Sequence, residues 1–229
     1  MSNKNTLPKI VLLHGWSANA PVNIMPLAEE LRGKGYEVFL PHLPGFGESS
    51  NPPIPWFVED YVEWVREEIK KKGWENVIIC GHSFGGRIGM KMAKKYPDMI
   101  EKLVLMAAAG IKHELGFKAK LVRAVGSLGR FFFNLPLLNK LQPIMYSFWK
   151  TILGRKDYYK VSGVMQKTFI NVVEEDLRPI VPMISVPTLV MWGKKDAMVP
   201  IEDAYFLEKS INNSRLKVYS QGDHKIPYD

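Results

Sequence analysis

The chain lacks the features that mark disulfide-rich, repetitive and membrane-spanning proteins. Its 229 residues include one cysteine, Cys80, so no disulfide can form within the chain. The longest uncharged apolar stretch, residues 103–111, is far shorter than a membrane-spanning helix, and no internal repeat is present. The polar residues 1–9 show no secretory signal. These absences favour a globular protein of a reducing compartment, and we expect a cytoplasmic location.

Acidic residues are scarce in one segment, and this makes the charge uneven. The net charge is +8, with ordinary hydrophobic and charged contents of 46% and 24%. Residues 111–168 carry eleven lysines and arginines against two acidic residues, a net charge of +9, whereas the rest of the chain is −1. The length suits one α/β domain, so the basic excess belongs to a region of that domain.

Short apolar runs alternate with amphipathic helical patterns along most of the chain. Strands are predicted at residues 9–13, 36–40, 77–80, 103–106, 188–192 and 216–219. Helices are predicted at residues 26–34, 58–72, 84–95 and 202–210, and residues 41–55 form a loop rich in proline. This alternation predicts an α/β fold with a mostly parallel sheet and helices on both faces.

The alternation is interrupted by residues 111–186, which are basic, aromatic and helical in pattern. We therefore expect a core formed by residues 1–110 and 187–229, with residues 111–186 as a helical cap over the carboxyl ends of the strands. The cap is either a solvated lid with an aromatic core or a surface that recruits an acidic partner. An anionic membrane surface or an acidic carrier protein fits that charge, whereas no nucleic-acid-binding motif is present.

Residues 81–86 read GHSFGG and lie between a predicted strand and a predicted helix. In that context a Gly-x-Ser-x-Gly turn forces its serine into a strained conformation and exposes the hydroxyl, which makes Ser83 a candidate nucleophile. Gly81 and Gly85 lack a Cβ, so neighbouring backbone can pass closely. The alternative interpretation is an ordinary turn of small residues.

A serine nucleophile needs a base and a carboxylate that orients the base. Of the five histidines, His224 follows the last predicted strand and is the best candidate base, whereas the sharp turn directs His82 elsewhere. Asp196 follows the strand at 188–192 and is the candidate acid, although a turn-capping role is the alternative. Asp223 is the competitor, but it is too close to His224 in sequence to reach that imidazole easily.

The chemistry also needs donors for an oxyanion. One is the backbone N–H of Phe84, directly after the nucleophile, and the other is expected from the loop after the first strand, at the Trp16 N–H. The Trp16 side chain is expected to line the pocket. Cys80 lies within a predicted strand and is expected to be an inert buried thiol. No histidine and cysteine cluster has metal-ligand spacing, so neither a metal nor an organic cofactor is expected.

Five motifs resemble the α/β-hydrolase superfamily over essentially the whole chain. They are VLLHGW at 11–16, LPGFGES at 43–49, GHSFGG at 81–86, MWGKKD at 191–196 and GDH at 222–224. The resemblance implies the triad order Ser83, Asp196, His224 and an oxyanion hole at Trp16 and Phe84. Members of the superfamily also carry a strand pair before residue 9 and a helix after residue 224, and both are expected to be missing here.

The expected reaction is hydrolysis of a small-molecule carboxylic ester with an apolar acyl group. Related dehalogenases and epoxide hydrolases use an aspartate where this chain has Ser83. Hydrolases that cleave C–C bonds of ring-cleavage products differ at the positions of His82 and Lys225, and they are retained as an alternative. Residues 11–20 and 43–49 resemble the pimeloyl-carrier methyl ester esterases. A ligand receptor without catalysis on the same fold is the second alternative.

Overall fold

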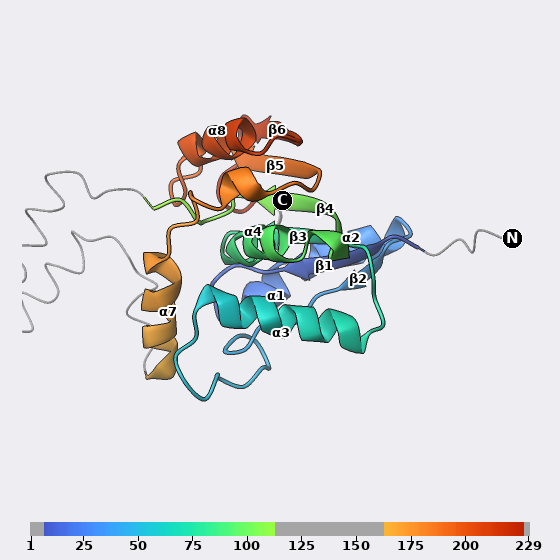
Figure 1. Ribbon diagram of the computed structural model, residues 1–229, viewed down its shortest axis with the longest axis vertical. Coiled ribbons are helices and arrows are strands. Elements are labelled where there is room, and N and C mark those ends of the chain that lie inside the picture. The colour runs from blue at the N-terminus through green and yellow to red at the C-terminus, as the bar shows by residue number, and fades with distance from the viewer. Residues whose placement is uncertain (1–6, 113–162, 227–229) are drawn as a thin grey trace, which may run out of the picture. The chain divides into compact units, whose positions relative to one another are not determined.

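The computed structural model describes residues 7–112 and 163–226, which belong to one compact unit. Six strands form a sheet in the order β2-β1-β3-β4-β5-β6, and every neighbouring pair is parallel. The strands are β1 (Lys9–Leu13), β2 (Glu37–Phe39), β3 (Val77–His82), β4 (Ile100–Met106), β5 (Thr188–Gly193) and β6 (Ser214–Tyr219). Because the strands are parallel, all six carboxyl ends meet at one edge of the sheet (Figure 1).

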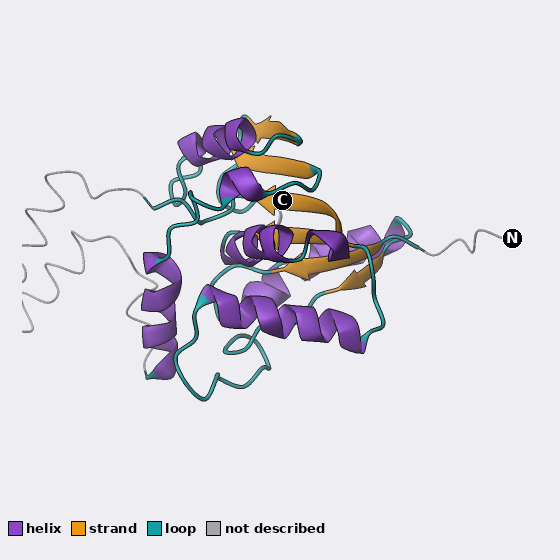
Figure 2. Ribbon diagram, in the orientation of Figure 1, coloured by secondary structure: helices purple, strands orange, loops and turns teal. Residues whose placement is uncertain are grey.

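Helices separate the strands in the described chain, as Figure 2 shows in purple. They are α1 (Ala20–Asn23), α2 (Met25–Gly33), α3 (Val58–Lys71), α4 (Phe84–Lys95), α7 (Val164–Glu174) and α8 (Ile201–Ser210), with short 3₁₀ turns at η1 (Pro97–Met99) and η4 (Val181–Met183). After α2 and α3 the chain turns through glycines in the left-handed region, Gly35 at φ 86° and Gly73 at φ 64°. Each directly follows a predicted helix, the first at residues 26–34 and the second at residues 58–72.

Alternate strand residues face opposite sides of the sheet, and each side has its own helices. The side that carries Val11, Ile79 and Val190 packs against α4 and α8, and α3 packs on α4. The opposite side forms a core with α2 and with Ile24, which directly precedes α2. The buried members of this core are Ile10, Leu12, Ile24, Ala28, Val38, Ile78, Cys80 and Met106. Figure 1 shows α3 and α4 in front of the sheet and α2 behind it.

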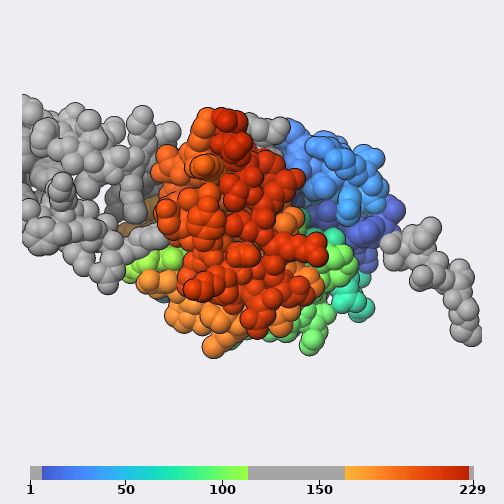
Figure 3. Space-filling model, turned by 90° about the horizontal axis from the view of Figure 1, so that it is seen from above, coloured from blue at the N-terminus to red at the C-terminus, as the bar shows by residue number. Residues whose placement is uncertain are grey.

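The predicted α/β class and parallel sheet are confirmed, with modest differences at the element ends. The sheet extends β3 through His82, two residues past its predicted end, and it shortens β2 to three residues. Helix α4 has the predicted bounds. Strand β5, helix α8 and strand β6 follow one another in sequence and form one continuous face, orange to red in Figure 3.

Most of the predicted cap, residues 113–162, lies outside the described residues, and the cap therefore stays a prediction. Of its remainder, residues 164–174 form α7. The expected absence of a strand pair and of a terminal helix also stays a prediction. None of the helices in the described ranges is long and apolar enough to cross a membrane.

Candidate active site

The turn between β3 and α4 holds Ser83 in the strained conformation that its motif predicts. Ser83 has φ 50° and ψ −107°, in a region that residues with a Cβ rarely occupy. Its N–H donates to the carbonyl of Met106 at 3.0 Å, and its carbonyl accepts from the N–H of Gly86 at 3.0 Å and of Ala109 at 3.1 Å. The end of β4 and the residues after it therefore help to hold the strained turn in place.

The glycines of this turn are required by close approach of backbone atoms, as predicted. A Cβ on Gly81 would lie 2.4 Å from the carbonyl oxygen of Gly85. A Cβ on Gly85 would lie 2.2 Å from the carbonyl oxygen of Leu13, at the end of β1. Neither neighbour is a flexible side chain, so only glycine fits at either position.

The loop after β1 lies directly against this turn. The N–H of Gly85 donates to the carbonyl of His14 at 3.1 Å, and a Cβ on Gly15 would lie 3.5 Å from the Cβ of Ser83. The rings of Trp16 and Phe84 pack edge to face at 5.1 Å. Within the described residues, neither backbone N–H of this pair donates to another protein group. The two predicted oxyanion donors are thus neighbours beside Ser83, and their role stays a prediction.

His14 supports this loop in a way that the sequence did not indicate. Its ring is fully buried, its Nδ1 lies 2.8 Å from the carbonyl oxygen of Gly15, and its Nε2 accepts from the N–H of Leu43 at 3.2 Å. Burial lowers the pKa of His14 to about 4, so the ring is neutral near pH 7. The neutral imidazole ties the loop after β1 to the loop after β2.

His224 and Asp196 come together at the same sheet edge, from the loops after β6 and β5. His224 Nδ1 donates to Asp196 Oδ2 at 2.8 Å, and the side chains are 13% and 0% exposed. Burial by itself would raise the pKa of the Asp196 carboxyl. The hydrogen bonds from His224 and from two backbone N–H groups outweigh it and lower that pKa. Asp196 is therefore ionised and holds the imidazole by one nitrogen.

The two loops are also joined through their backbones. The N–H of Lys195 donates to the carbonyl of Gly222 at 2.9 Å. Asp223 does not compete for the imidazole, because its Oδ1 accepts from the N–H of Lys225 at 2.7 Å. The structure therefore pairs His224 with Asp196, and the catalytic roles of these two residues stay a prediction.

Ser83 and His224 share no direct hydrogen bond among the described residues, and His82 is the contact between their segments. His82 Nε2 lies 2.9 Å from the carbonyl oxygen of His224, and the two rings are 4.9 Å apart. Sequence reasoning dismissed His82 because of the sharp turn. Its position beside Ser83 was the available signal, but the acceptor is a backbone carbonyl 142 residues away, which has no signature in the sequence.

Aromatic rings surround the predicted oxyanion donors. Trp16 packs edge to face on Phe46 at 4.8 Å and on Phe169 of α7 at 5.2 Å. Phe84 packs on Tyr61 of α3 at 5.0 Å. Helix α7 is attached to the loop before α3 by hydrogen bonds between the Trp56 backbone and the side chains of two α7 residues. Trp16 and Phe84 therefore lie among aromatic rings, and the expected place of the Trp16 side chain in a pocket wall stays a prediction.

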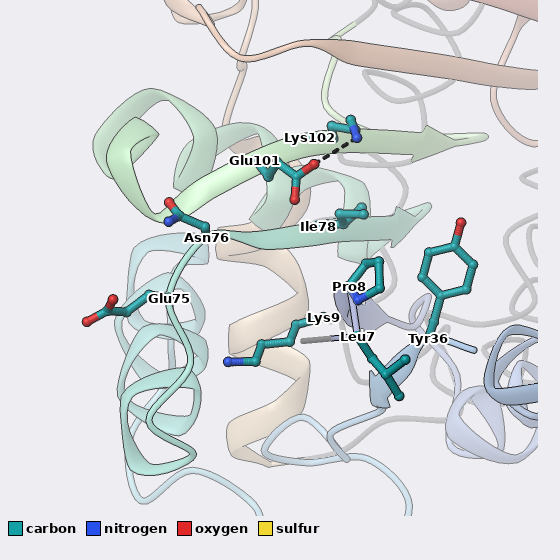
Figure 4. Close-up of a pocket in the computed structure, with 9 residues that line it drawn as sticks. All are labelled: Leu7, Pro8, Lys9, Tyr36, Glu75, Asn76, Ile78, Glu101 and Lys102. Carbon is teal, nitrogen blue, oxygen red and sulfur yellow. Dashed lines mark hydrogen bonds and ion pairs between the residues drawn. The ribbon is translucent and has the colours of Figure 1, made fainter. Parts of the chain in front are cut away.

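A separate shallow pocket lies at the opposite edge of the sheet (Figure 4). Its lining includes Lys9, Glu101 and Lys102, near the amino ends of β1 and β4, and the last two form an ion pair at 2.7 Å. Ligand crevices of open parallel sheets lie at the carboxyl ends of strands, so this pocket is not the candidate site. In the part of the chain that the structure describes, no group of three or more metal-ligating side chains is found.

Comparison with known proteins agrees with this fold. The chain is 27% identical over 241 residues to an AB hydrolase superfamily protein of Bacillus subtilis, covering 96% of this chain and 86% of the relative. It is 26% identical over 234 residues to Lipase 1 of Psychrobacter immobilis, covering 94% and 70%. An esterase structure from Exiguobacterium antarcticum superposes with a TM-score of 0.70 at 26% identity, covering 95% of this chain and 85% of that one.

The family comparison spans nearly the entire chain. The model of the family described as "Serine aminopeptidase, S33" matches residues 5–229. The parallel sheet, the strained serine turn after β3 and the solved relatives agree with that match. The protein therefore belongs to this family of the α/β-hydrolase superfamily, and it is a hydrolase.

Proposed function

We propose that the protein is a serine hydrolase that cleaves carboxylic esters through an acyl-enzyme intermediate. The observation that carries the proposal is the strained Ser83 turn at the same sheet edge as the buried His224–Asp196 pair. Lipase and esterase relatives support an ester substrate. The aromatic rings beside Ser83 suit an apolar acyl group.

The proton transfers proposed for the first step start from the hydrogen bond between His224 and Asp196. Because His224 Nδ1 carries the hydrogen donated to Asp196, Nε2 of the neutral ring has the free lone pair. Ser83 Oγ attacks the ester carbonyl as Nε2 removes its proton, and the new oxyanion accepts from the N–H groups of Trp16 and Phe84. The intermediate collapses, the C–O bond to the alcohol breaks, and Nε2 returns the proton to the departing alkoxide.

Water completes the reaction along the same route. It gives a proton to His224 Nε2 and attacks the acyl carbon, and the second tetrahedral intermediate again places its oxyanion on the two N–H groups. Collapse breaks the bond to Ser83 Oγ, which recovers the proton from His224. The products are one alcohol and one carboxylic acid, and the residues return to their starting states.

The test is turnover of p-nitrophenyl esters of graded acyl length, together with labelling by a fluorophosphonate. Ser83→Ala should lower kcat by about 10⁴-fold or more and abolish labelling while the fold is retained. Ser185→Ala, an exposed serine before β5, is the matched control and should leave both unchanged. Wild-type protein that neither turns over any ester nor is labelled would contradict the proposal and favour the receptor alternative.

A further inference from the structure

His82 is a buried imidazole that has no part in the proposed proton transfers. It is the last residue of β3, directly before Ser83, and it is 3% exposed. Its Nε2 lies 2.9 Å from the carbonyl oxygen of His224. A buried polar ring is costly unless its nitrogens are satisfied, so this contact is a determinant of where the ring lies.

The direction of this hydrogen bond follows from its partner. A carbonyl oxygen can only accept, so Nε2 of His82 carries the hydrogen. Burial, aided by the nearby His224 ring, lowers the pKa of His82 to about 4. At neutral pH the ring is therefore an uncharged donor, and it adds no positive charge beside the proposed base.

The hydrogen bond attaches the loop of His224 to a second strand. The His224 side chain on Asp196 and the Gly222 carbonyl, which accepts from Lys195, both attach this loop to the loop after β5. The His224 carbonyl on His82 attaches it instead to the end of β3. Because His82 and Ser83 are adjacent, this bond relates the position of the base directly to that of the nucleophile.

The loop after β1 meets the same ring from another side. A Cβ on Gly15 would lie 3.0 Å from His82 Nδ1, so the loop after β1 packs directly on the imidazole of His82. His82 thus contacts both loops that the proposed chemistry uses. We propose that His82 is a positioning residue, which holds His224 in line with Ser83 by donating a hydrogen bond to the His224 carbonyl. This inference rests on the proposed ester hydrolysis.

A matched pair of substitutions separates the effect of the His82 hydrogen-bond donor from the effect of its side-chain packing. In His82→Gln the amide nitrogen reaches about as far as Nε2 and keeps a donor, whereas His82→Met has similar length and no donor. His82→Met should lower kcat about tenfold to a hundredfold with KM nearly unchanged, because misplaced reacting groups slow chemistry more than binding. His82→Gln should recover most of the loss. His82→Phe, which keeps a flat ring without a donor, replaces Met if that variant does not fold.

A spectroscopic measurement tests the same idea without turnover. The proton on His224 Nδ1, shared with Asp196, should give a downfield NMR signal in wild type and in His82→Gln. The signal should broaden or disappear in His82→Met. If wild-type protein hydrolyses no ester and is not labelled, the proposed function fails, and this spectrum still tests whether His82 holds the His224 loop.

Two results would overturn the inference. One is a His82→Met variant with wild-type kcat and an unchanged downfield signal, which would show that the donor is dispensable. The other is a His82→Gln variant that is as slow as His82→Met although both are folded, which would assign His82 to packing alone.

Discussion

At the scale of single residues, the two oxygens of Asp196 accept hydrogen bonds from three residues. Oδ2 accepts from His224 Nδ1 at 2.8 Å, while Oδ1 accepts from the N–H groups of Met198 at 2.8 Å and Val199 at 2.9 Å. The turn-capping bonds, and the bond to the imidazole that an orienting role would use, were alternatives in the sequence, and both are present here. The backbone bonds fix the carboxylate so that Oδ2 faces the imidazole.

Replacing Asp196 by asparagine should reveal the orienting role. The amide group can accept with one atom only, so either the bond from His224 or the backbone bonds are lost. We expect kcat for ester hydrolysis to fall on the order of 10³–10⁴-fold, since the imidazole no longer has its Nδ1 hydrogen fixed. Measurement of kcat and KM with one p-nitrophenyl ester checks this.

Asp223→Asn provides the control, because it makes the same chemical change next to His224. Asp223 is exposed and bonds only the N–H of Lys225 among the described residues. Its substitution should leave kcat close to wild type. A loss as large as that of Asp196→Asn would move the acid assignment to Asp223.

At the scale of elements, the unit of β3, turn and α4 is held against β1 by contacts between backbones. Gly85 lies where α4 crosses the end of β1, and its N–H donates to His14. This unit was predictable from sequence because the glycines, the apolar run and the amphipathic helix are all local signals. The packing of helix α7 was not predictable, since its hydrogen bonds to Trp56 join residues more than 100 positions apart.

Gly85→Ala should destabilise the protein more than a surface glycine substitution. The new Cβ would lie 2.2 Å from the carbonyl oxygen of Leu13, so α4 or β1 must shift. We expect the free energy of unfolding to fall by at least roughly 1–3 kcal/mol, the usual range for overpacking. Urea unfolding followed by circular dichroism measures it.

Gly33→Ala is the matched control for this prediction. Gly33 is the last residue of α2, and a Cβ there meets nothing within 4 Å. The substitution should leave stability unchanged or raise it by about 0.5–1 kcal/mol, as alanine in place of glycine does in helices. Equal losses in the two variants would show that close approach at Gly85 is not the cause.

At the scale of the whole molecule, the sequence predicted the class of fold and the edge of the sheet at which the candidate residues meet. Ser83, Asp196 and His224 each follow a separate strand, and parallel strands bring such residues together whatever their separation in sequence. The hydrogen bonds that connect the loops were not predictable in this way. His14 and His82 act through backbone groups of Leu43 and His224, and a backbone group looks the same at every position.

The same two histidines make the stability of the molecule depend on pH. Burial lowers the pKa of both His14 and His82 to about 4, below the ordinary value of 6.5. Between these values the unfolded chain binds protons that the folded chain excludes. The contribution of these two rings to the free energy of unfolding is therefore fully present above pH 6.5 and declines as the pH falls toward 4. The complete loss of that contribution is roughly 3 kcal/mol for each ring.

Urea unfolding of wild type and His82→Gln at pH 7, 6 and 5 tests this account. Wild-type stability should fall steeply from pH 7 to pH 5, because unfolding near pH 5 takes up about two protons on these rings. His82→Gln removes one ring, and its proton uptake should fall by about one while His14 still titrates. The other titratable groups are the same in the two proteins. The difference between their slopes of unfolding free energy against pH therefore reports on His82 alone. Parallel slopes would mean that His82 is protonated as readily in the folded protein as in the unfolded chain, and its neutral hydrogen bond to His224 would not describe the native state.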